Sequence, residues 1–322
     1  MLIALGALVV GLIVLTWSAD KFIDGAAAVA QQFGMSPLLV GILIIGFGTS
    51  APEMLVSTMA ALDGEPDLAL GNAIGSNIAN IGLILGITAV LAPIAVHSKV
   101  VYQEVPLMLA ATGLGVVVLL NGFLGQGDGV LLLAALAAYI GFGIWQSVRS
   151  PDDAFGAEVD EVVSHEQSLG KAFFALIVGL LLLLASSRLL VWSATEIALA
   201  LGISELIIGL TIVALGTSLP ELAASIASVR KNQHEMAVGN VIGSNVFNIL
   251  GVVGIAGLIH PDVVASVVLS RDSVVMVLLS VALAVLCFRA MKGGAITRWQ
   301  GGLLVAAYVG YNLALAADVI FS

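Results

Sequence analysis

The segments GTSAPE (48–53) and GTSLPE (216–221) share one pattern, and the residues around them extend the match. Residues 34–87 align without a gap to residues 202–255, at a constant spacing of 168, and 22 of the 54 pairs are identical. The identical residues are mostly polar or helix-breaking, so chance similarity between two apolar helices does not explain them. The chain therefore contains an internal repeat. Its second polar pair is GNAIGSNIAN (71–80) with GNVIGSNVFN (239–248).

The composition indicates a membrane protein. Of 322 residues, 60% are hydrophobic and only 10% are charged, and the mean hydropathy is +1.13. Soluble domains are about a quarter charged, whereas apolar stretches of about 20 residues, enough to cross a bilayer, recur along this chain. The net charge of −10 argues against nucleic-acid binding, which needs a basic surface. A single cysteine excludes internal disulfides and cysteine-built metal sites.

The apolar stretches predict an all-α polytopic membrane protein with ten transmembrane helices. We expect a first five-helix repeat at 1–147, an acidic cytoplasmic linker at 148–169 and a second five-helix repeat at 170–322. Because each repeat has an odd number of helices, the second enters the membrane in the opposite direction, as in many secondary transporters. The expected helices are 1–31, 38–61, 68–92, 100–121, 128–147, 170–200, 206–229, 235–258, 271–290 and 299–321.

The distribution of Lys and Arg predicts the orientation. With the amino terminus outside, inner loops hold eight of the eleven cations, and outer loops hold only Arg271. The positive-inside rule then places both termini outside and the linker in the cytoplasm. The first 20 residues lack the basic region and cleavage site of a secretory signal, so we interpret them as a retained first helix.

Two glutamates are expected inside the membrane. Glu53 lies well inside the second expected helix, and Glu221 takes the same place in the seventh. An acid at such a depth costs about 2.5–3.5 kcal/mol on translocon scales, so it indicates function by default. The alternative is a structural acid, protonated or hydrogen-bonded to serine, but a symmetry-related pair makes this interpretation weaker.

Each glutamate follows a proline, Pro52 or Pro220, which removes a backbone donor and frees a carbonyl one turn back. Such backbone is tolerated in a membrane where it lines a cavity or is buried in protein. A proline kink satisfied by Thr or Ser is the structural alternative, and it explains one motif better than two. The candidate ligands are main-chain oxygens of Gly46, Thr49, Ala214 and Thr217 and the hydroxyls of Ser50 and Ser218.

The second pair of polar segments supplies more oxygen atoms. Ser76 and Asn80 are four residues apart on one helical face, as are Ser244 and Asn248. For these four side chains, ion ligation and interhelical hydrogen bonding stay open. The glycines of the same segments form small-xxx-small patterns that permit close helix packing, at positions 71, 75, 239 and 243.

The combined ligand set suits a hard cation. It contains carboxylates, hydroxyls, amides and carbonyls but no histidine or cysteine, and all-oxygen coordination is typical of calcium. Two carboxylates neutralise one calcium ion or two monovalent ions, so the sequence predicts mutually exclusive occupancy and exchange. No cofactor is expected. Glu104 and Asp272, also 168 apart, are interpreted mainly as helix-start and packing residues, with ion access as the alternative.

At the GTSxPE and GNxxGSNxxN segments, the chain resembles the calcium/cation antiporter superfamily, specifically its prokaryotic sodium/calcium exchanger branch. The resemblance covers the full length and implies that Glu53 and Glu221 bind calcium and sodium, with carbonyls of Thr49 and Thr217 completing the calcium site. Some relatives have aspartate at the position of Asn248. The resemblance also implies sodium sites from Gly46, Ser50, Ser76, Ala214, Ser218 and Ser244, with Asn80 and Asn248 near the centre.

Three alternatives compete with sodium/calcium exchange. Calcium/proton antiport is the nearest, because a carboxylate pair also binds protons. An intramembrane hydrolase lacks its motifs here: there is no HExxH and no histidine beside a serine nucleophile. A cation channel more often builds its filter on a multi-subunit axis. The expected partners are calcium and sodium ions and the lipid bilayer of a prokaryotic inner membrane, with no obligate protein partner.

Overall fold

The computed structural model describes residues 2–33, 35–64, 66–96, 100–149, 168–201, 216, 218–292 and 294–321, and nearly all of them are helical. The first half contains α1 (Leu2–Phe33), α2 (Pro37–Leu39), η1 (Val40–Gly46), α3 (Phe47–Thr49), α4 (Ala51–Leu62), α5 (Pro66–Ala79), η2 (Asn80–Leu85), α6 (Gly86–Leu91), η3 (Val100–Glu104), α7 (Val105–Leu119) and α8 (Gln126–Arg149). The second half contains α9 (Leu169–Ala200), α12 (Leu219–Arg230), α13 (His234–Val246), η6 (Phe247–Val253), α14 (Gly254–Ile259), η7 (Val268–Asp272), α15 (Ser273–Met291) and α16 (Arg298–Phe321). The η segments are π-helical.

The helices confirm a polytopic membrane protein. Within the described residues, eight helices are long and apolar enough to cross a bilayer, and a bent pair, 40–49 with 51–62, makes a ninth candidate. The seventh expected helix is described only as α12, because most of 202–217 lies outside the described residues. Most of the expected linker, 150–167, lies outside them too.

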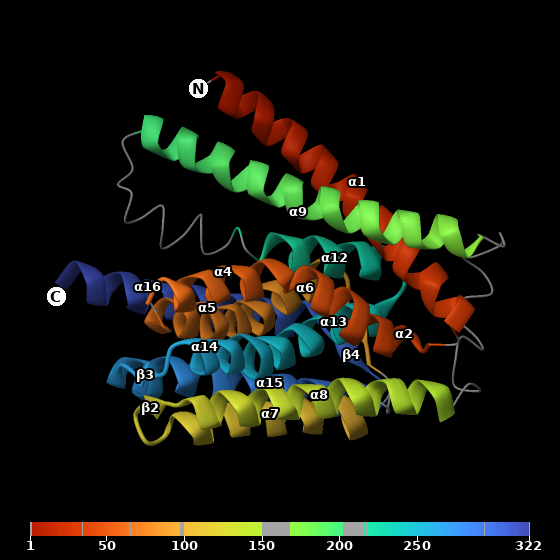
Figure 1. Ribbon diagram of the computed structural model, residues 1–322. Coiled ribbons are helices and arrows are strands. Elements are labelled where there is room, and N and C mark those ends of the chain that lie inside the picture. The colour runs from red at the N-terminus through yellow and green to blue at the C-terminus, as the bar shows by residue number, and fades with distance from the viewer. Residues whose placement is uncertain are drawn as a thin grey trace.

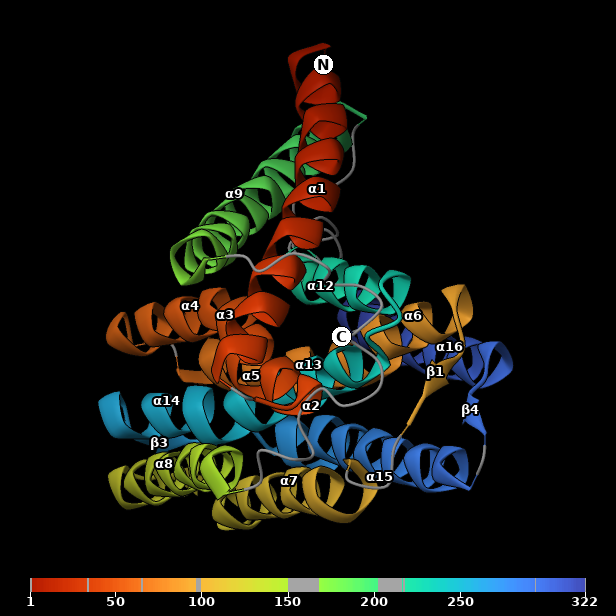
Figure 2. The same cartoon turned by 90° about the vertical axis from the view of Figure 1, so that its right-hand side faces the viewer.

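The helices are arranged around a central group. Helices α1 and α9 pack along each other and form a layer on one side, above α12 and α4 (Figures 1 and 2). Helices α7 and α8 lie on the opposite side, and α5 and α13 run between the two layers (Figure 1). The described ends of the chain, in α1 and α16, lie at the same end of the molecule (Figure 1).

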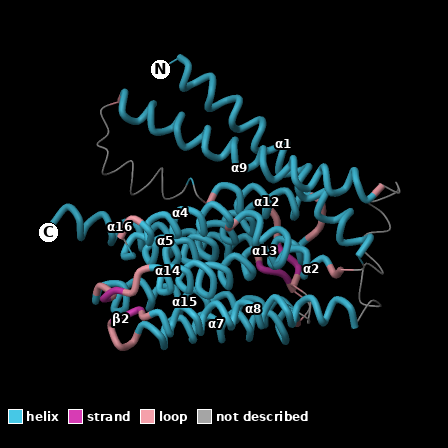
Figure 3. Tube along the Cα trace, viewed as in Figure 1, coloured by secondary structure: helices cyan, strands magenta, loops and turns pink. Residues whose placement is uncertain are grey.

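Two short sheets that the sequence did not predict connect the halves. Strand β1 (Ile94–Ala95) pairs antiparallel with β4 (Ala295–Ile296), and β2 (Phe123–Leu124) pairs antiparallel with β3 (Asp262–Val263). The two pairs lie at opposite ends of the helical bundle (Figure 3). Each sheet therefore joins a loop of the first half to a loop of the second.

Glycines let α13 approach the helix of η1 at backbone distance. A Cβ atom on Gly239 would lie 2.6 Å from the carbonyl oxygen of Leu38, and one on Gly243 would lie 2.6 Å from that of Ile42. Real Cβ atoms do not come so close to a carbonyl oxygen, so only glycine fits. The packing role expected for these two glycines is confirmed. A Cβ atom on Gly71 or Gly75 would meet nothing within 4 Å among the described residues, so their packing role stays a prediction.

We expect Gly243→Ala to reduce the thermal stability of the purified protein by about 1–3 kcal/mol, the usual cost of overpacking. The added methyl group must push the backbone of Ile42 away from α13. Gly141→Ala is the matched control, since its Cβ would meet nothing within 4 Å among the described atoms. Thermal unfolding in detergent measures the difference. Equal stabilities of the two variants would contradict the close packing.

Candidate ion-binding site

Both glutamates occupy the first turn of a helix that starts inside the protein. Glu53 lies in α4 and Glu221 in α12, each directly after a proline in the first turn. The helix axis bends by 46° between α3 and α4, as expected for a proline break. Glu53 is 1% exposed and Glu221 is 2% exposed, so neither is a surface acid. The bend therefore directs an acidic first turn into the middle of the bundle.

Equivalent hydrogen bonds fix the first turns of α4 and α12. In the first half, Asn72 Nδ2 donates to Ser57 Oγ at 2.9 Å and to the Glu53 carbonyl oxygen at 3.3 Å. In the second half, Asn240 Nδ2 donates to Ser225 Oγ at 2.8 Å and to the Glu221 carbonyl oxygen at 3.1 Å. These asparagines fix the backbone of the two glutamates. Sequence reasoning assigned them no role, although their spacing of 168 marked them.

Other contacts cross between the halves. Ser50 Oγ donates to Glu221 Oε1 at 3.4 Å, and Thr49 Oγ1 donates to Asn240 Oδ1 at 3.2 Å. Ser244 Oγ donates to the carbonyl oxygen of Gly46 at 3.4 Å. The GTSAPE motif of the first half therefore contacts both polar motifs of the second half.

Asparagines also meet at the centre of the bundle. Asn80 Nδ2 donates to Asn245 Oδ1 at 3.1 Å, and Asn77 Nδ2 donates to the Asn245 carbonyl oxygen at 3.1 Å. Asn80 is the first residue of the π-helical segment η2, and Asn248 is the second residue of η6. Asn80 thus makes an interhelical hydrogen bond through its nitrogen, while its oxygen can still face an ion. Asn77 and Asn245 belong to the duplicated GNxxGSNxxN segments, but the sequence indicated no role for them.

Several buried oxygen atoms have no hydrogen-bond partner among the described residues. Buried polar atoms of a folded protein are almost always paired. Five such atoms belong to the duplicated motifs, and two of them are carboxylate oxygens, which is the pattern expected where a cation supplies the missing interaction. Glu53 and Glu221 also lie close enough to interact electrostatically. The five atoms are Glu53 Oε2, Glu221 Oε2, Ser218 Oγ, Asn77 Oδ1 and Asn248 Oδ1.

The predicted ligands fall into three groups. The contacts described above cross between the halves at Gly46, Thr49, Ser50, Glu221 and Ser244, and Asn80 makes its own cross-half contact with Asn245. Glu53, Ser218 and Asn248 are buried, and Ser76 shares a pocket with Ser218. Ala214 and Thr217 lie outside the described residues. Within the described residues, no three His, Cys, Asp or Glu side chains gather, so a cation here relies on two carboxylates and neutral oxygens.

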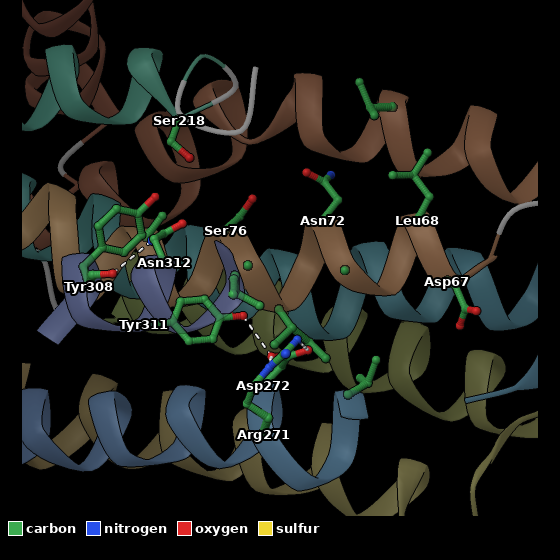
Figure 4. Close-up of a pocket in the computed structure, with 17 residues that line it drawn as sticks. Asp67, Leu68, Asn72, Ser76, Ser218, Arg271, Asp272, Tyr308, Tyr311 and Asn312 are labelled. Atoms are coloured by element: carbon green, nitrogen blue, oxygen red, sulfur yellow. Dashed lines mark hydrogen bonds and ion pairs between the residues drawn. The ribbon is translucent and has the colours of Figure 1, made fainter. Parts of the chain in front are cut away.

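A pocket of about 450 Å³ reaches this region from the end of the bundle where α5 begins. Figure 4 shows Asp67, Asn72 and Ser76 following one another along α5. Ser218 lies at one end of the pocket, and Asp272 and Tyr311 lie across from α5. The lining is largely apolar apart from these groups. The pocket therefore connects Ser76 and Ser218 with the end of the molecule where Asp67 lies.

Comparison with known proteins decides the family. The sequence pattern of the family described as "Sodium/calcium exchanger protein" matches residues 3–145 and 171–316, which is most of the chain. This protein is a member of the sodium/calcium exchanger family. The resemblance seen in the duplicated motifs is confirmed, and the hydrolase alternative is wrong, since the family consists of transporters.

Individual relatives of this exchanger-family protein match along nearly its whole length. The protein CaxA of Alkalimonas amylolytica is 43% identical over 98% of this chain and 99% of its own. Inner membrane protein YrbG of Escherichia coli K12 is 41% identical over 90% of each chain. The solved structure of the sodium-calcium exchanger NCX_Mj is 34% identical, covers 98% of both chains and superposes with a TM-score of 0.82.

Proposed function

We propose that the protein is a secondary active transporter that exchanges calcium for sodium by alternating access to one central site. The observation that carries the proposal is the pair of buried carboxylates, Glu53 and Glu221, each with an oxygen that has no partner among the described residues. Family membership supports it. The similar structure of NCX_Mj is described as soaked with Na⁺ and Ca²⁺, which supports these two ions as the cargo.

The charge of the site explains exchange. With both glutamates ionised and no other fixed charge, the site carries −2, so one Ca²⁺ or two Na⁺ neutralise it. Because a net charge in a low-dielectric interior is costly, calcium and sodium exclude one another. The proposed ligands are Glu53, Glu221, Thr49, Thr217, Ser50, Ser218, Ser76, Ser244, Asn80, Asn248, Gly46 and Ala214.

Proton-coupled calcium exchange is the nearest alternative, because protons compete for the same carboxylates. Proteoliposomes loaded with calcium distinguish the two when sodium, proton and potassium gradients are imposed separately. We expect calcium efflux with an inward sodium gradient and little with a proton gradient alone. Efflux driven equally well by protons in the absence of sodium would refute sodium coupling.

We also propose that the fold consists of ten transmembrane helices in two inverted five-helix repeats, 1–147 and 170–322, joined by an acidic linker at 148–169. The paired contacts of Asn72 and Asn240 support the repeat, as do the two strand pairs. The location we propose is a prokaryotic inner membrane with both termini outside. The excess of Lys and Arg in the loops expected inside supports this orientation.

The orientation predicts that position 156 lies in the cytoplasm and the carboxyl terminus outside. A reporter enzyme that is active only outside the inner membrane should be inactive when fused at Gly156 and active when fused after Ser322. A reporter active in the cytoplasm should give the opposite pattern. Activity of the external reporter at Gly156 would refute the orientation.

A further inference from the structure

A second duplicated acid lies outside the glutamate motifs. Glu104 and Asp272 are 168 residues apart and precede α7 and α15 directly. Both residues stand at the N-cap position, as expected, but neither side chain makes a capping hydrogen bond to its helix. Each accepts a hydrogen bond from a tyrosine instead. Tyr139 Oη donates to Glu104 Oε2 at 3.4 Å, and Tyr311 Oη donates to Asp272 Oδ1 at 3.0 Å.

The two tyrosines are equivalent in the repeat although their spacing is 172 rather than 168. Helix α15 has 19 residues where α7 has 15, and this difference of four shifts everything that follows. The next strands, β2 and β4, and the next helices, α8 and α16, also begin 172 residues apart. The acid–tyrosine contact is therefore a feature of both halves, and the shift hid it from an alignment of constant spacing.

The two pairs differ in their surroundings. Glu104 is 3% exposed and Tyr139 is 9% exposed, so the first pair is closed inside the protein. Asp272 and Tyr311 line the pocket that also contains Ser76 and Ser218 of the proposed ion site (Figure 4). Arg271 adds an ion pair to Asp272 at 2.6 Å. One pair is therefore buried while its equivalent faces a route to the site.

The Asp272–Tyr311 and Glu104–Tyr139 pairs lie toward opposite ends of the helical bundle. Asp272 ends η7, the first helical segment after β3, and Glu104 ends η3, the first helical segment after β1. The sheets that contain β3 and β1 lie at opposite ends of the molecule (Figure 3). The proposed orientation puts Asp272 outside and Glu104 inside. Burying a carboxylate is costly unless a hydrogen bond, a charge partner or a proton compensates it, and the tyrosine hydroxyl supplies a hydrogen bond in the closed pair.

We propose that the Asp272–Tyr311 and Glu104–Tyr139 pairs line the outer and inner access routes to the ion site, and that exposure of one pair accompanies burial of the other. This inference rests on the proposed function, because it assumes one site reached alternately from two sides. The structure then represents the state in which the outer route is open. In the opposite state, Glu104 and Tyr139 face water and Asp272 and Tyr311 are closed.

Cysteine accessibility tests the proposal in the full-length protein. Cys287, which is fully buried, is first replaced by serine. Tyr311→Cys and Tyr139→Cys are then made separately and together, and a membrane-impermeant thiol reagent is applied to right-side-out and inverted vesicles. We expect position 311 to react only from outside and position 139 only from inside. In the double variant, labelling one cysteine with a bulky reagent should reduce the labelling rate of the other cysteine at least about tenfold.

Matched controls exist in the same helices. Thr112 in α7 and Ser280 in α15 are equivalent and buried, so Thr112→Cys and Ser280→Cys should react slowly from both sides. If the tyrosine variants do not insert, Glu104→Cys and Asp272→Cys report on the same two positions. Reaction of both positions from one side, or rates that do not depend on each other, would overturn the proposal.

The two hypotheses fail separately. Independent reaction at positions 139 and 311 in a protein that exchanges calcium for sodium would overturn the access routes alone. Mutually exclusive reaction in a protein without sodium-driven calcium flux would support the routes and overturn the proposed cargo. The labelling rate is read without any transported ion, so it does not depend on the flux result.

Discussion

Glu53→Gln and Glu221→Gln should each nearly abolish calcium transport while the protein still inserts and folds. Glutamine has the shape of glutamate, and the neighbouring hydrogen bond from Ser50 to Glu221 can be kept by its carbonyl. However, the site would carry −1 instead of −2 and leave a bound calcium half compensated. Breaking a buried charge pair costs about 3–5 kcal/mol, which corresponds to a loss of affinity of at least about a hundredfold.

The measurement is calcium uptake into sodium-loaded proteoliposomes, together with calcium binding to the purified protein. Glu196→Gln is the matched control, because Glu196 is an exposed residue of α9 that belongs to neither motif. Glu196→Gln removes one negative charge, as the two test substitutions do, and should leave calcium uptake unchanged. A properly folded Glu53→Gln variant with wild-type uptake would rule out the shared two-carboxylate site.

Asn248→Asp should shift the balance from calcium toward sodium. Asn248 is buried, and its Oδ1 atom has no hydrogen-bond partner among the described residues. If the new acid ionises, the site carries −3, so one Ca²⁺ leaves −1 whereas three Na⁺ give neutrality. In the present protein, three Na⁺ would leave +1. Because a buried net charge is unfavourable, we expect sodium to compete more strongly in the variant, or a proton to restore neutrality.

Sodium inhibition of calcium binding, measured across pH in both proteins, tests this expectation. Asn121→Asp is the control for a general change of charge, because Asn121 is exposed and accepts a hydrogen bond from the Phe123 N–H that aspartate can also accept. It should leave the competition unchanged. Competition curves for Asn248→Asp that coincide with the unmodified protein would show that position 248 is electrically separate from the ion site.

The described structure explains why some predictions from sequence succeeded. Apolar stretches have to cross the bilayer as helices, since only helices and closed barrels satisfy the backbone there. The eight apolar helices and the bend before Glu53 follow from this rule and from Pro52. The family followed from the duplicated GTSxPE and GNxxGSNxxN motifs, whose match is too specific to arise from composition.

Contacts between distant helices could not be predicted in the same way. A spacing of 168 shows that Asn72 and Asn240 are equivalent, but it does not show what they touch. In particular, it does not show that Asn240 binds Thr49 of the other half. The Tyr311–Asp272 contact was hidden by the four extra residues of α15.

The sequence by itself therefore determined the membrane class, the duplication, the family and the two acids that the fold buries, because hydropathy, proline and charge act locally along the chain. Only the tertiary structure decided which oxygens meet across the halves and which acid–tyrosine pair is buried. Glycine-mediated packing of α13 against η1 brings Ser244 to the Gly46 carbonyl. Such packing depends on how helices cross in three dimensions, and a one-dimensional pattern does not contain that geometry.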